Sequence, residues 1–374
     1  MRPSQTMLSE SFSTPKSILV IHVTRIGDTL LTTPSLRALG DFLSNSLDTA
    51  DKPESKQPQL TFLGHPKRAE VVRHLPYLRR QGCISKTRAL WLGHYHARCK
   101  RKPYDLAFVY GFDSALVAYA LRVAQRVVAF RQNSDALNRR LYRVVELPPA
   151  QSLHAVDLLL KLPAAVGITA RSRRLDYLVS TAEQNWAHAA LTRQLPAGLE
   201  LLVGLQVASF PTRAYRDWPI EHFLALSERI RARYPKVHFL IFGGSAEQAR
   251  TEALAKTLGA CATSYAGRLT LRQTAALMNQ IDLYIGVDTG PTHMMSALQK
   301  PMVALYHAYL PSHLLAPLDH PCAYVIDHPL PAHQATPETP MADITVERVW
   351  QVVSQALSEH PPQRGSCLAG SNKI

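Results

Sequence analysis

The chain has 374 residues, of which 46% are hydrophobic and 19% are charged, and this composition is typical of a folded protein and excludes a disordered one. Its length suits two domains of ordinary size. The formal net charge is +14, and the five cysteines include no C-x-x-C pair, which excludes a disulfide framework or a cysteine zinc site and favours a reducing cytoplasm.

Strands and helices are predicted to alternate in the first half of the chain. After a loose polar tail at 1–16, the short aliphatic run at 18–23 predicts a buried strand. A helix follows with Asp28 as a plausible N-cap, and its apolar positions include Leu31, Leu39 and Phe42. The next predicted segments are a polar loop at 44–58, strands at 60–63 and 105–110, and a helix at 114–123.

The second half repeats this alternation after a stretch at 169–195 that carries the predicted linker. Strands are predicted at 201–207, 237–242, 282–287 and 302–306, and helices at 220–234, 247–258, 271–280, 292–298 and 346–357. Alternation at this spacing indicates parallel sheets. We therefore expect two doubly wound α/β domains, at 17–180 and 181–360, a tail at 361–374, and ligands at the carboxyl ends of the strands.

No segment predicts a membrane span. The best candidate, at 107–124, is interrupted by Asp113 and Arg122. The run at 18–23 is too short and, because of His22, too polar for the core of a signal peptide. The protein is therefore expected to stay in the cytoplasm.

The first candidate site is the segment RIGDTLLTTP at 25–34, directly after the first predicted strand. Gly27 and Asp28 then lie at the carboxyl end of that strand, where doubly wound sheets bind ligands. The Asp28 carboxylate has two interpretations, a general base that faces the cleft or a cap of its helix. The pattern alone does not decide between them.

The second candidate site is DTGPTH at 288–293, which also follows a strand and opens a helix. Thr289 and Gly290 would present backbone N–H groups and a hydroxyl to a phosphate at the helix N-terminus, and His293 can donate to a phosphate oxygen. The alternative is an ordinary turn in which His293 is satisfied locally. The position after a strand favours the anion site.

A third candidate is Arg216, in a loop that precedes the helix at 220–234, from where its side chain could reach a pyrophosphate. A surface arginine without a role is the alternative. The chain lacks the dinucleotide-binding and P-loop glycine patterns, a D-x-D motif and histidines at metal spacing. We therefore expect no cofactor and no metal, and helix N-termini with basic side chains would hold any pyrophosphate.

In order and spacing, these segments resemble the ADP-heptose lipopolysaccharide heptosyltransferases of Gram-negative bacteria. The resemblance runs from about residue 18 to 357 and includes ILVIHVTRIGDTLLTTPSLRAL, YDLAFVYGFDSALVAYAL, HAVDLLLKLPAAVGI, RDWPIEHFLALSERI and IDLYIGVDTGPTHMMSALQKPMVALY. It implies the GT-B architecture, in which two Rossmann-like domains face a central cleft. It also implies an inverting, metal-independent transfer of heptose from ADP-heptose to the lipopolysaccharide inner core.

The resemblance assigns roles by position. Asp28 matches the aspartate proposed to deprotonate the acceptor hydroxyl, Glu247 matches a residue that contacts the donor nucleotide, and Asp288 matches one that holds donor-sugar hydroxyls. The pyrophosphate cradle matches Thr289, Gly290 and His293.

Two positions depart from the family pattern. Arg216 stands where lysine is common, and Phe210-Pro211 stand where small residues are usual. Arginine keeps the charge and adds a planar fork, whereas Phe210 and Pro211 could reshape the nucleotide pocket. A related transferase that uses another nucleotide sugar is therefore the alternative.

The positive charge is confined to the first half of the chain. Residues 1–180 carry 27 Lys and Arg against 13 Asp and Glu, whereas residues 181–374 carry 15 of each. This asymmetry favours an anionic partner over a solvated face. The resemblance makes the partners an anionic glycolipid acceptor and the inner-leaflet surface, with the acceptor-binding residues expected to be Arg25, Arg68, Arg73, Lys100, Arg101 and Lys102.

A nucleic-acid-binding protein is the remaining alternative that the basic first half raises. It is disfavoured because the basic run at 100–102 has only Tyr95 and Tyr104 near it and no nucleic-acid-binding module is recognisable. We therefore expect no nucleic-acid partner.

Overall fold

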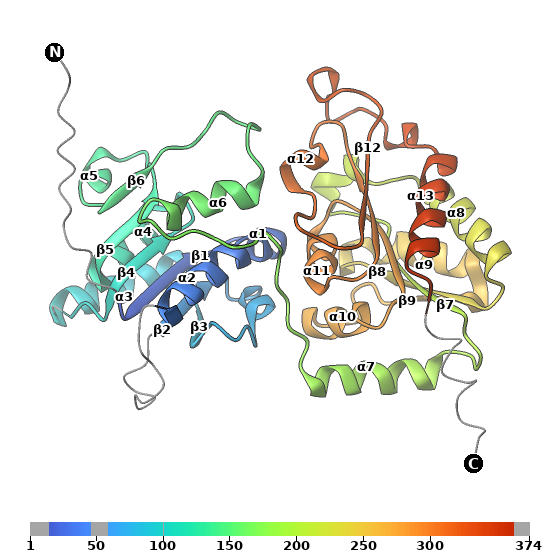
Figure 1. Ribbon diagram of the computed structural model, residues 1–374, viewed down its shortest axis with the longest axis horizontal. Coiled ribbons are helices and arrows are strands. Elements are labelled where there is room, and N and C mark those ends of the chain that lie inside the picture. The colour runs from blue at the N-terminus through green and yellow to red at the C-terminus, as the bar shows by residue number, and fades with distance from the viewer. Residues whose placement is uncertain (1–14, 46–58, 100, 363–374) are drawn as a thin grey trace.

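The computed structural model describes residues 15–45, 59–99 and 101–362. Two six-stranded sheets lie side by side, all their strand pairings are parallel, and helices cover them (Figure 1). The predicted two-sheet α/β architecture is confirmed. The predicted tails, and the polar loop at 44–58, fall almost entirely outside the described residues.

The first sheet has the strand order β3-β2-β1-β4-β5-β6, so the chain reverses its direction of travel beside β1. Ligands bind at such a reversal, at the carboxyl ends of the strands. The strands are β1 (Ser17–His22), β2 (Gln59–Gly64), β3 (Arg80–Cys83), β4 (Tyr104–Val109), β5 (Ala124–Phe130) and β6 (Arg143–Val145). The helices are α1 (Ile26–Leu31), α2 (Thr33–Asn45), η2 (Ala69–Val72), α3 (Lys86–Cys99), α4 (Ser114–Val123), α5 (Asp135–Asn138) and α6 (Ala155–Ala164).

The second sheet has the order β12-β11-β10-β7-β8-β9, and its reversal lies between β10 and β7. Its strands are β7 (Leu201–Gln206), β8 (Val237–Phe242), β9 (Ala262–Ser264), β10 (Leu283–Val287), β11 (Met302–Tyr306) and β12 (Ala323–Asp327). The α-helices are α7 (Thr181–Gln194), α8 (Ile220–Arg233), α9 (Gln248–Leu258), α10 (Leu271–Met278), α11 (Gly290–Leu298), α12 (Ser312–Leu315) and α13 (Val346–Glu359). The 3-10 turns are η3 (Pro211–Arg216), η4 (Ser245–Glu247), η5 (Gly259–Cys261), η6 (Ala332–Gln334) and η7 (Met341–Asp343).

The apolar core joins the two sheets. On β1, Leu19 and Ile21 pack with α3 and α4, whereas Ile18 and Val20 belong to a cluster with α2 and α6. That second cluster continues into the other half of the chain, through side chains such as Met294. None of the helices in the described residues has the length and apolarity needed to cross a membrane.

The helix predicted after Asp28 is two helices, α1 and α2, with Thr32 between them. Thr29 and Thr32 donate their hydroxyls to the backbone oxygens of Arg25 and Asp28, and Pro34 has no N–H to continue the helical ladder. The threonines and proline of TLLTTP are therefore the signal for the break.

Several elements were not predicted. The helix α7 lies inside the stretch interpreted as linker, although Ser180 and Glu183 form a capping box at its start. Strand β5 follows α4 without a loop. The apolar run across Val123 and Ala124 therefore contains no turn residue that marks where the helix ends and the strand begins, and β5 was not predicted. The strands β3, β6, β9 and β12 and the helices α3 and α6 were also missed.

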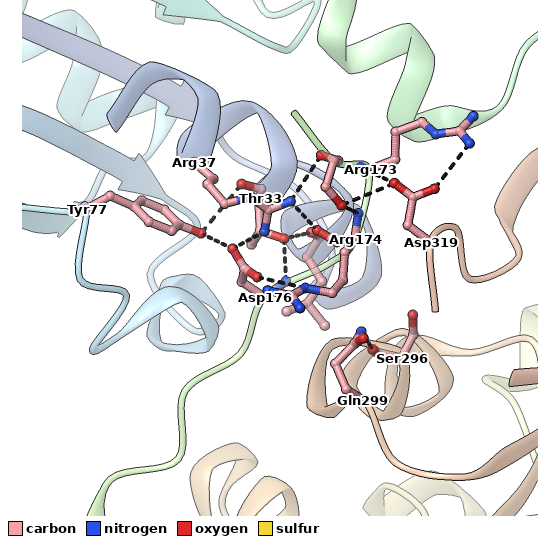
Figure 2. A network of polar contacts seen from close by, with 11 residues as sticks. Thr33, Arg37, Tyr77, Arg173, Arg174, Asp176, Ser296, Gln299 and Asp319 are labelled. Carbon is pink, nitrogen blue, oxygen red and sulfur yellow. Dashed lines mark hydrogen bonds and ion pairs between the residues drawn. The ribbon is translucent and has the colours of Figure 1, made fainter. Parts of the chain in front are cut away.

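The segment that connects the two halves is held against α2. Arg37 donates to the carbonyl oxygens of Ser172 and Arg174 at 3.0 and 2.8 Å and pairs with Asp176. The Asp176 carboxylate also accepts from the Tyr77 hydroxyl at 2.9 Å (Figure 2). These contacts therefore fix residues 172–176 of the connecting segment to the first half of the chain.

The same segment also touches the second half. The Asp319 carboxylate accepts from the backbone N–H of Arg173 at 2.8 Å and from the Ser172 hydroxyl at 3.1 Å (Figure 2). A further tie joins His154 of the first half to the backbone oxygen of Ala316, at 3.0 Å. These contacts limit how far the two sheets can separate.

Beyond that segment, α7 is fixed to the second half by a paired charge. Arg272 of α10 is buried and donates to both carboxylate oxygens of Glu183, at 2.7 and 2.6 Å, and to the backbone oxygen of Leu178. Its guanidinium lies 4.6 Å from the ring centre of Tyr177. These hydrogen bonds lower the pKa of Glu183 to about 2.

We predict that Glu183→Gln lowers the free energy of unfolding by about 1–3 kcal/mol at pH 7. A carboxyl with a depressed folded pKa stabilises the protein above its unfolded pKa, so the difference from the parent should shrink as the pH falls from about 4.5 towards about 2. Urea unfolding over that range measures it. The exposed pair Glu252–Arg268 provides the control, because solvent screens it and Glu252→Gln should cost clearly less than Glu183→Gln. Equal losses in both variants would contradict the prediction.

Candidate active site between the two sheets

Two helix N-termini, one from each half of the chain, meet between the sheets. Helix α1 follows the carboxyl end of β1, and α11 follows that of β10. A Cβ atom on Gly27 would lie 2.6 Å from Cδ2 of His293, and one on Gly290 would lie 3.5 Å from Cβ of Ile26. The two motifs singled out in the sequence therefore form one site, and the His293 ring requires glycine at position 27.

Asp28 lies in the first turn of α1, and the N-cap position belongs to Arg25. The interpretation of Asp28 as the cap is therefore wrong. Its Oδ2 accepts from the Thr24 hydroxyl at 2.9 Å, and the side chain is partly exposed. Thr24 fixes the orientation of the carboxylate, so that Oδ1 can accept a proton from a bound hydroxyl, and the helix N-terminus stabilises the negative charge.

Asp288 is buried at the end of β10, with 2% of its surface exposed, and is held by an arginine. Arg216 donates to Oδ2 at 2.7 Å and to the backbone oxygen of the same residue at 3.3 Å. The other carboxylate oxygen, Oδ1, has no hydrogen-bond partner in the structure. Arg216, which was expected in a loop with its charge free for pyrophosphate, therefore neutralises Asp288.

The N-terminus of α11 offers donors to an anion. Thr289 occupies the N-cap, but its side chain makes no capping hydrogen bond. Its hydroxyl lies 3.3 Å from that of Thr292. The His293 ring is buried one turn into the helix, with Nε2 3.5 Å from the free Oδ1 of Asp288. Backbone N–H groups, a hydroxyl and an imidazole thus converge where the helix dipole favours negative charge.

Glu247 is the last residue of η4, which follows the carboxyl end of β8, on the same edge of the sheet as Asp288. It is buried, and its Oε2 accepts from the backbone N–H of Gly244 at 2.7 Å. Like Oδ1 of Asp288, its Oε1 has no hydrogen-bond partner in the structure. A buried carboxylate oxygen without a donor is costly, and each of these two oxygens can accept from a ligand hydroxyl.

His22 was not predicted as a site residue, although it interrupts an aliphatic strand just before the Asp28 motif. Its Nδ1 lies 2.6 Å from the Thr32 hydroxyl, which itself donates to the backbone oxygen of Asp28. Nδ1 must therefore carry the proton. Burial lowers the pKa of His22 to about 4, against an opposing effect of Asp28, so the ring is neutral at pH 7 and leaves the Asp28 carboxylate uncompensated.

Of the basic residues expected to bind the acceptor, Arg68 is hydrogen-bonded to the segment that holds Asp28. Its guanidinium donates to the backbone oxygen of Thr24, whose hydroxyl holds Asp28. Arg73 lines a hollow of about 440 Å³ with Pro66, Lys67, Ala69, Glu70, Gln81, Gly82 and Cys83. Arg25 is exposed at the start of α1.

Arg101 and Lys102 lie elsewhere. They precede β4, which runs parallel to β1, whereas Asp28 follows the end of β1. A strand of this length separates the two edges of the sheet by roughly 20 Å. This corrects the expectation that Arg101 and Lys102 line the approach to Asp28. The expectation for Lys100 falls outside the described residues.

Metal ligands do not gather at this site. Within the part of the chain that the structure describes, no three His, Cys, Asp or Glu side chains are placed so that they could hold a metal ion. The charged groups described above are instead the two helix N-termini, Arg216 and Arg68, with Asp28, Glu247 and Asp288 as the acids.

Comparison with known proteins identifies one family. The model of glycosyltransferase family 9 (heptosyltransferase) matches residues 96–334. The lipopolysaccharide core heptosyltransferase OpsX of Haemophilus influenzae is 20% identical over 308 residues, which are 79% of this chain and 80% of that protein.

Solved structures agree in fold. The ADP-heptose lipopolysaccharide heptosyltransferase II of E. coli is similar over 92% of this chain and 99% of its own, with a TM-score of 0.73 and 19% identity. The E. coli heptosyltransferase WaaC with ADP is similar over 91% of this chain and 99% of its own, with a TM-score of 0.65 and 17% identity.

We predict that Arg216→Ala destabilises the protein by about 3–5 kcal/mol, because it leaves the buried Asp288 carboxylate without its cation. Urea unfolding at pH 7 measures the loss. Arg250→Ala is the control: Arg250 also pairs with an aspartate, Asp217 at 2.6 Å, but it is more exposed and that carboxylate keeps two donors from Ser209.

Adding Asp288→Asn to Arg216→Ala should recover part of the loss, since it removes the uncompensated charge. A loss no larger than that of Arg250→Ala, or no recovery in the double variant, would show that the pair is not a determinant of stability.

Proposed function

The chain belongs to glycosyltransferase family 9, and from this premise we propose that it transfers heptose from ADP-heptose to the inner core of lipopolysaccharide. The observation that carries the proposal is the pair of unpartnered buried oxygens, Oδ1 of Asp288 and Oε1 of Glu247, on the sheet edge where α11 opens. Two acceptors of hydroxyl protons on the sheet edge that also carries an anion-binding helix N-terminus suit a nucleotide sugar.

The donor binds in the second half of the chain in this proposal. Its pyrophosphate lies at the N-terminus of α11, against Thr289, Gly290 and His293. The free oxygen of Asp288 accepts from hydroxyls of the heptose, and that of Glu247 accepts from a hydroxyl of the nucleotide. Arg216 holds Asp288 in place and adds positive charge beside the pyrophosphate as ADP leaves.

The acceptor binds in the first half, and Asp28 is the base. A hydroxyl of the acceptor attacks the anomeric carbon while Oδ1 of Asp28 takes its proton, the bond to ADP breaks, and the configuration inverts in one displacement. The Thr24 hydroxyl keeps Oδ2 occupied, and the neutral His22 does not offset the charge that the base needs. Arg25, Arg68 and Arg73 bind carboxylates and phosphates of the acceptor.

The direct test is incubation of the protein with ADP-heptose and a panel of truncated lipopolysaccharide acceptors, with products read by mass spectrometry. The expected product is heavier than its acceptor by one heptose. Absence of any heptosylated product from all acceptors, with a folded protein, contradicts the proposal.

A transferase that uses another nucleotide sugar is the second candidate, because the chain departs from the family pattern at two positions: Phe210, which is exposed before η3, and Pro211, the first residue of η3. Calorimetric titration separates the two: ADP should bind more tightly than UDP if the donor is ADP-heptose. A basic nucleic-acid-binding protein is the remote alternative, for which a salt-dependent gel shift is the test.

We predict that Asp28→Asn lowers kcat by about two to four orders of magnitude, because a general base is lost. ADP affinity and thermal stability should stay close to those of the parent. Asp41→Asn, on the neighbouring helix α2, is the matched control and should keep kcat within about twofold. Near-normal turnover of Asp28→Asn would reduce Asp28 to a structural residue.

We predict that His293→Ala raises the Kd for ADP by about tenfold or more, which is the loss expected for one charge-assisted contact with the pyrophosphate. Activity should persist in EDTA, since the proposal gives the charge on the leaving group to helix α11, His293 and Arg216. Calorimetry and the transfer assay measure the two effects. Unchanged ADP affinity, or complete loss of activity on chelation, rejects this donor site.

A further inference from the structure

Helix α3 carries the largest apolar side chains that the first half of the chain exposes along one element. Trp91, Tyr95 and Leu90 are 70%, 57% and 50% exposed. Tryptophan and leucine side chains are normally covered in a folded protein. Trp91 and Tyr95 lie one turn apart on one face of this helix, and Leu90 borders that face as the residue next to Trp91.

The opposite face of α3 is fixed to the protein. Ala89 and Gly93 are buried, and a Cβ atom on Gly93 would lie 2.7 Å from Nη1 of Arg122 on α4. The His96 ring also packs against that of Tyr119, at 6.3 Å between centres. The exposed patch is therefore the outward face of a docked helix, not a helix that has failed to pack.

Basic side chains surround the patch. Arg88 and Arg98 are exposed on the same helix, and Arg101 and Lys102 are exposed just beyond its end. The sequence contains no Asp or Glu between Glu70 and Asp105. Lys86 is exposed and pairs with Asp113 at 2.7 Å, so the positive charge of the patch comes from the remaining four cations.

We propose that this face, Leu90, Trp91 and Tyr95 with Arg88, Arg98, Arg101 and Lys102, docks the protein on the surface of an anionic phospholipid bilayer. The inference rests on the proposed function in taking the acceptor to be a membrane glycolipid. Indole and phenol rings favour the zone between headgroups and acyl chains, and the cations favour acidic headgroups. Two copies of this face would repel each other, and a nucleic acid would leave Leu90 without an apolar environment.

The position of α3 relates this face to the active site. The helix begins three residues after β3 ends, on the edge of the first sheet that also carries Asp28, and it runs to the opposite edge, before β4 (Figure 1). The hollow lined by Lys67 and Arg73 includes Cys83, the last residue of β3. A bilayer that contacts α3 therefore lies next to the sheet edge that carries Asp28, where the sugar of a membrane-anchored acceptor has to bind.

The test is flotation of the full chain with vesicles of phosphatidylethanolamine and phosphatidylglycerol, against phosphatidylcholine alone. Binding is expected only to the acidic vesicles and should weaken with salt. Leu90→Ala/Trp91→Ala should lower the partition coefficient by roughly tenfold, and Arg88→Gln/Arg98→Gln by about fivefold for each cation removed. Val325→Ala and Arg231→Gln/Lys256→Gln, exposed sites in the second half, are the matched controls and should bind as the parent does.

A second measurement uses the parent protein and does not depend on the folding of variants. Of the four tryptophans, Trp91 is exposed, whereas Trp218 is buried and Trp186 and Trp350 are partly buried. Lipids brominated near the headgroup should therefore quench the fluorescence of the parent, and Trp91→Phe should remove most of that quenching.

Several outcomes overturn the proposal: no binding of the parent to acidic vesicles at low salt, equal binding to neutral vesicles, or quenching unchanged in Trp91→Phe. A change of oligomeric state in the α3 variants with unchanged vesicle binding would instead assign the face to a second copy. Heptose transfer to a deacylated, soluble acceptor should be unchanged in the α3 variants. Vesicle binding without any transfer by the parent would reject the proposed function and keep the docking face.

Discussion

The close approach of α1 to α11 is the contact on which the site depends. Parallel strands bring both helix N-termini to the edges where the sheets face each other. The contact is tight because Gly27 has no Cβ, and any side chain there would enter the space of the His293 ring. The shared apolar cluster and the ties of Arg37 and Asp319 to the connecting segment keep the two halves at this separation.

The same site retains buried charge that is only half satisfied. Asp288 is neutralised by Arg216, and Glu247 accepts a backbone N–H, yet each keeps one oxygen without a donor. A buried oxygen without a donor costs folding free energy, so the presence of two such oxygens argues for a ligand that supplies hydroxyls. The same two oxygens make the site selective among ligands, because a ligand that lacks those hydroxyls leaves the oxygens unpaired and binds less tightly.

The sequence predicts the strands and helices of this protein better than its polar contacts. Long, strongly apolar strands such as β8 and β11, and helices with clear periodicity such as α4, were found at their observed bounds. The motifs at Asp28 and Asp288 were also found, because each follows such a strand.

What sequence could not supply is the set of contacts between residues far apart in the chain. The pairing of Arg216 with Asp288 spans 72 residues and converts an expected free cation into a bound one. Arg101 and Lys102 were expected at the acceptor site because the sequence does not show on which edge of the sheet a charged residue lies. The strand order shows that β4 begins at the edge opposite to Asp28.

The strand order also shows that the excess positive charge of the first half is divided between two edges of its sheet. Arg68, Arg73 and Lys67 lie on the edge that carries Asp28, whereas Arg101 and Lys102 lie on the other, roughly 20 Å away along the strands. Charges so far apart are screened from each other at physiological ionic strength, where the Debye length is about 8 Å. In the proposed function they therefore act on different anionic groups. An acceptor with charged sugars at one end and a lipid in an acidic bilayer at the other presents two such groups to one enzyme, and α3 is the element that spans the distance between them.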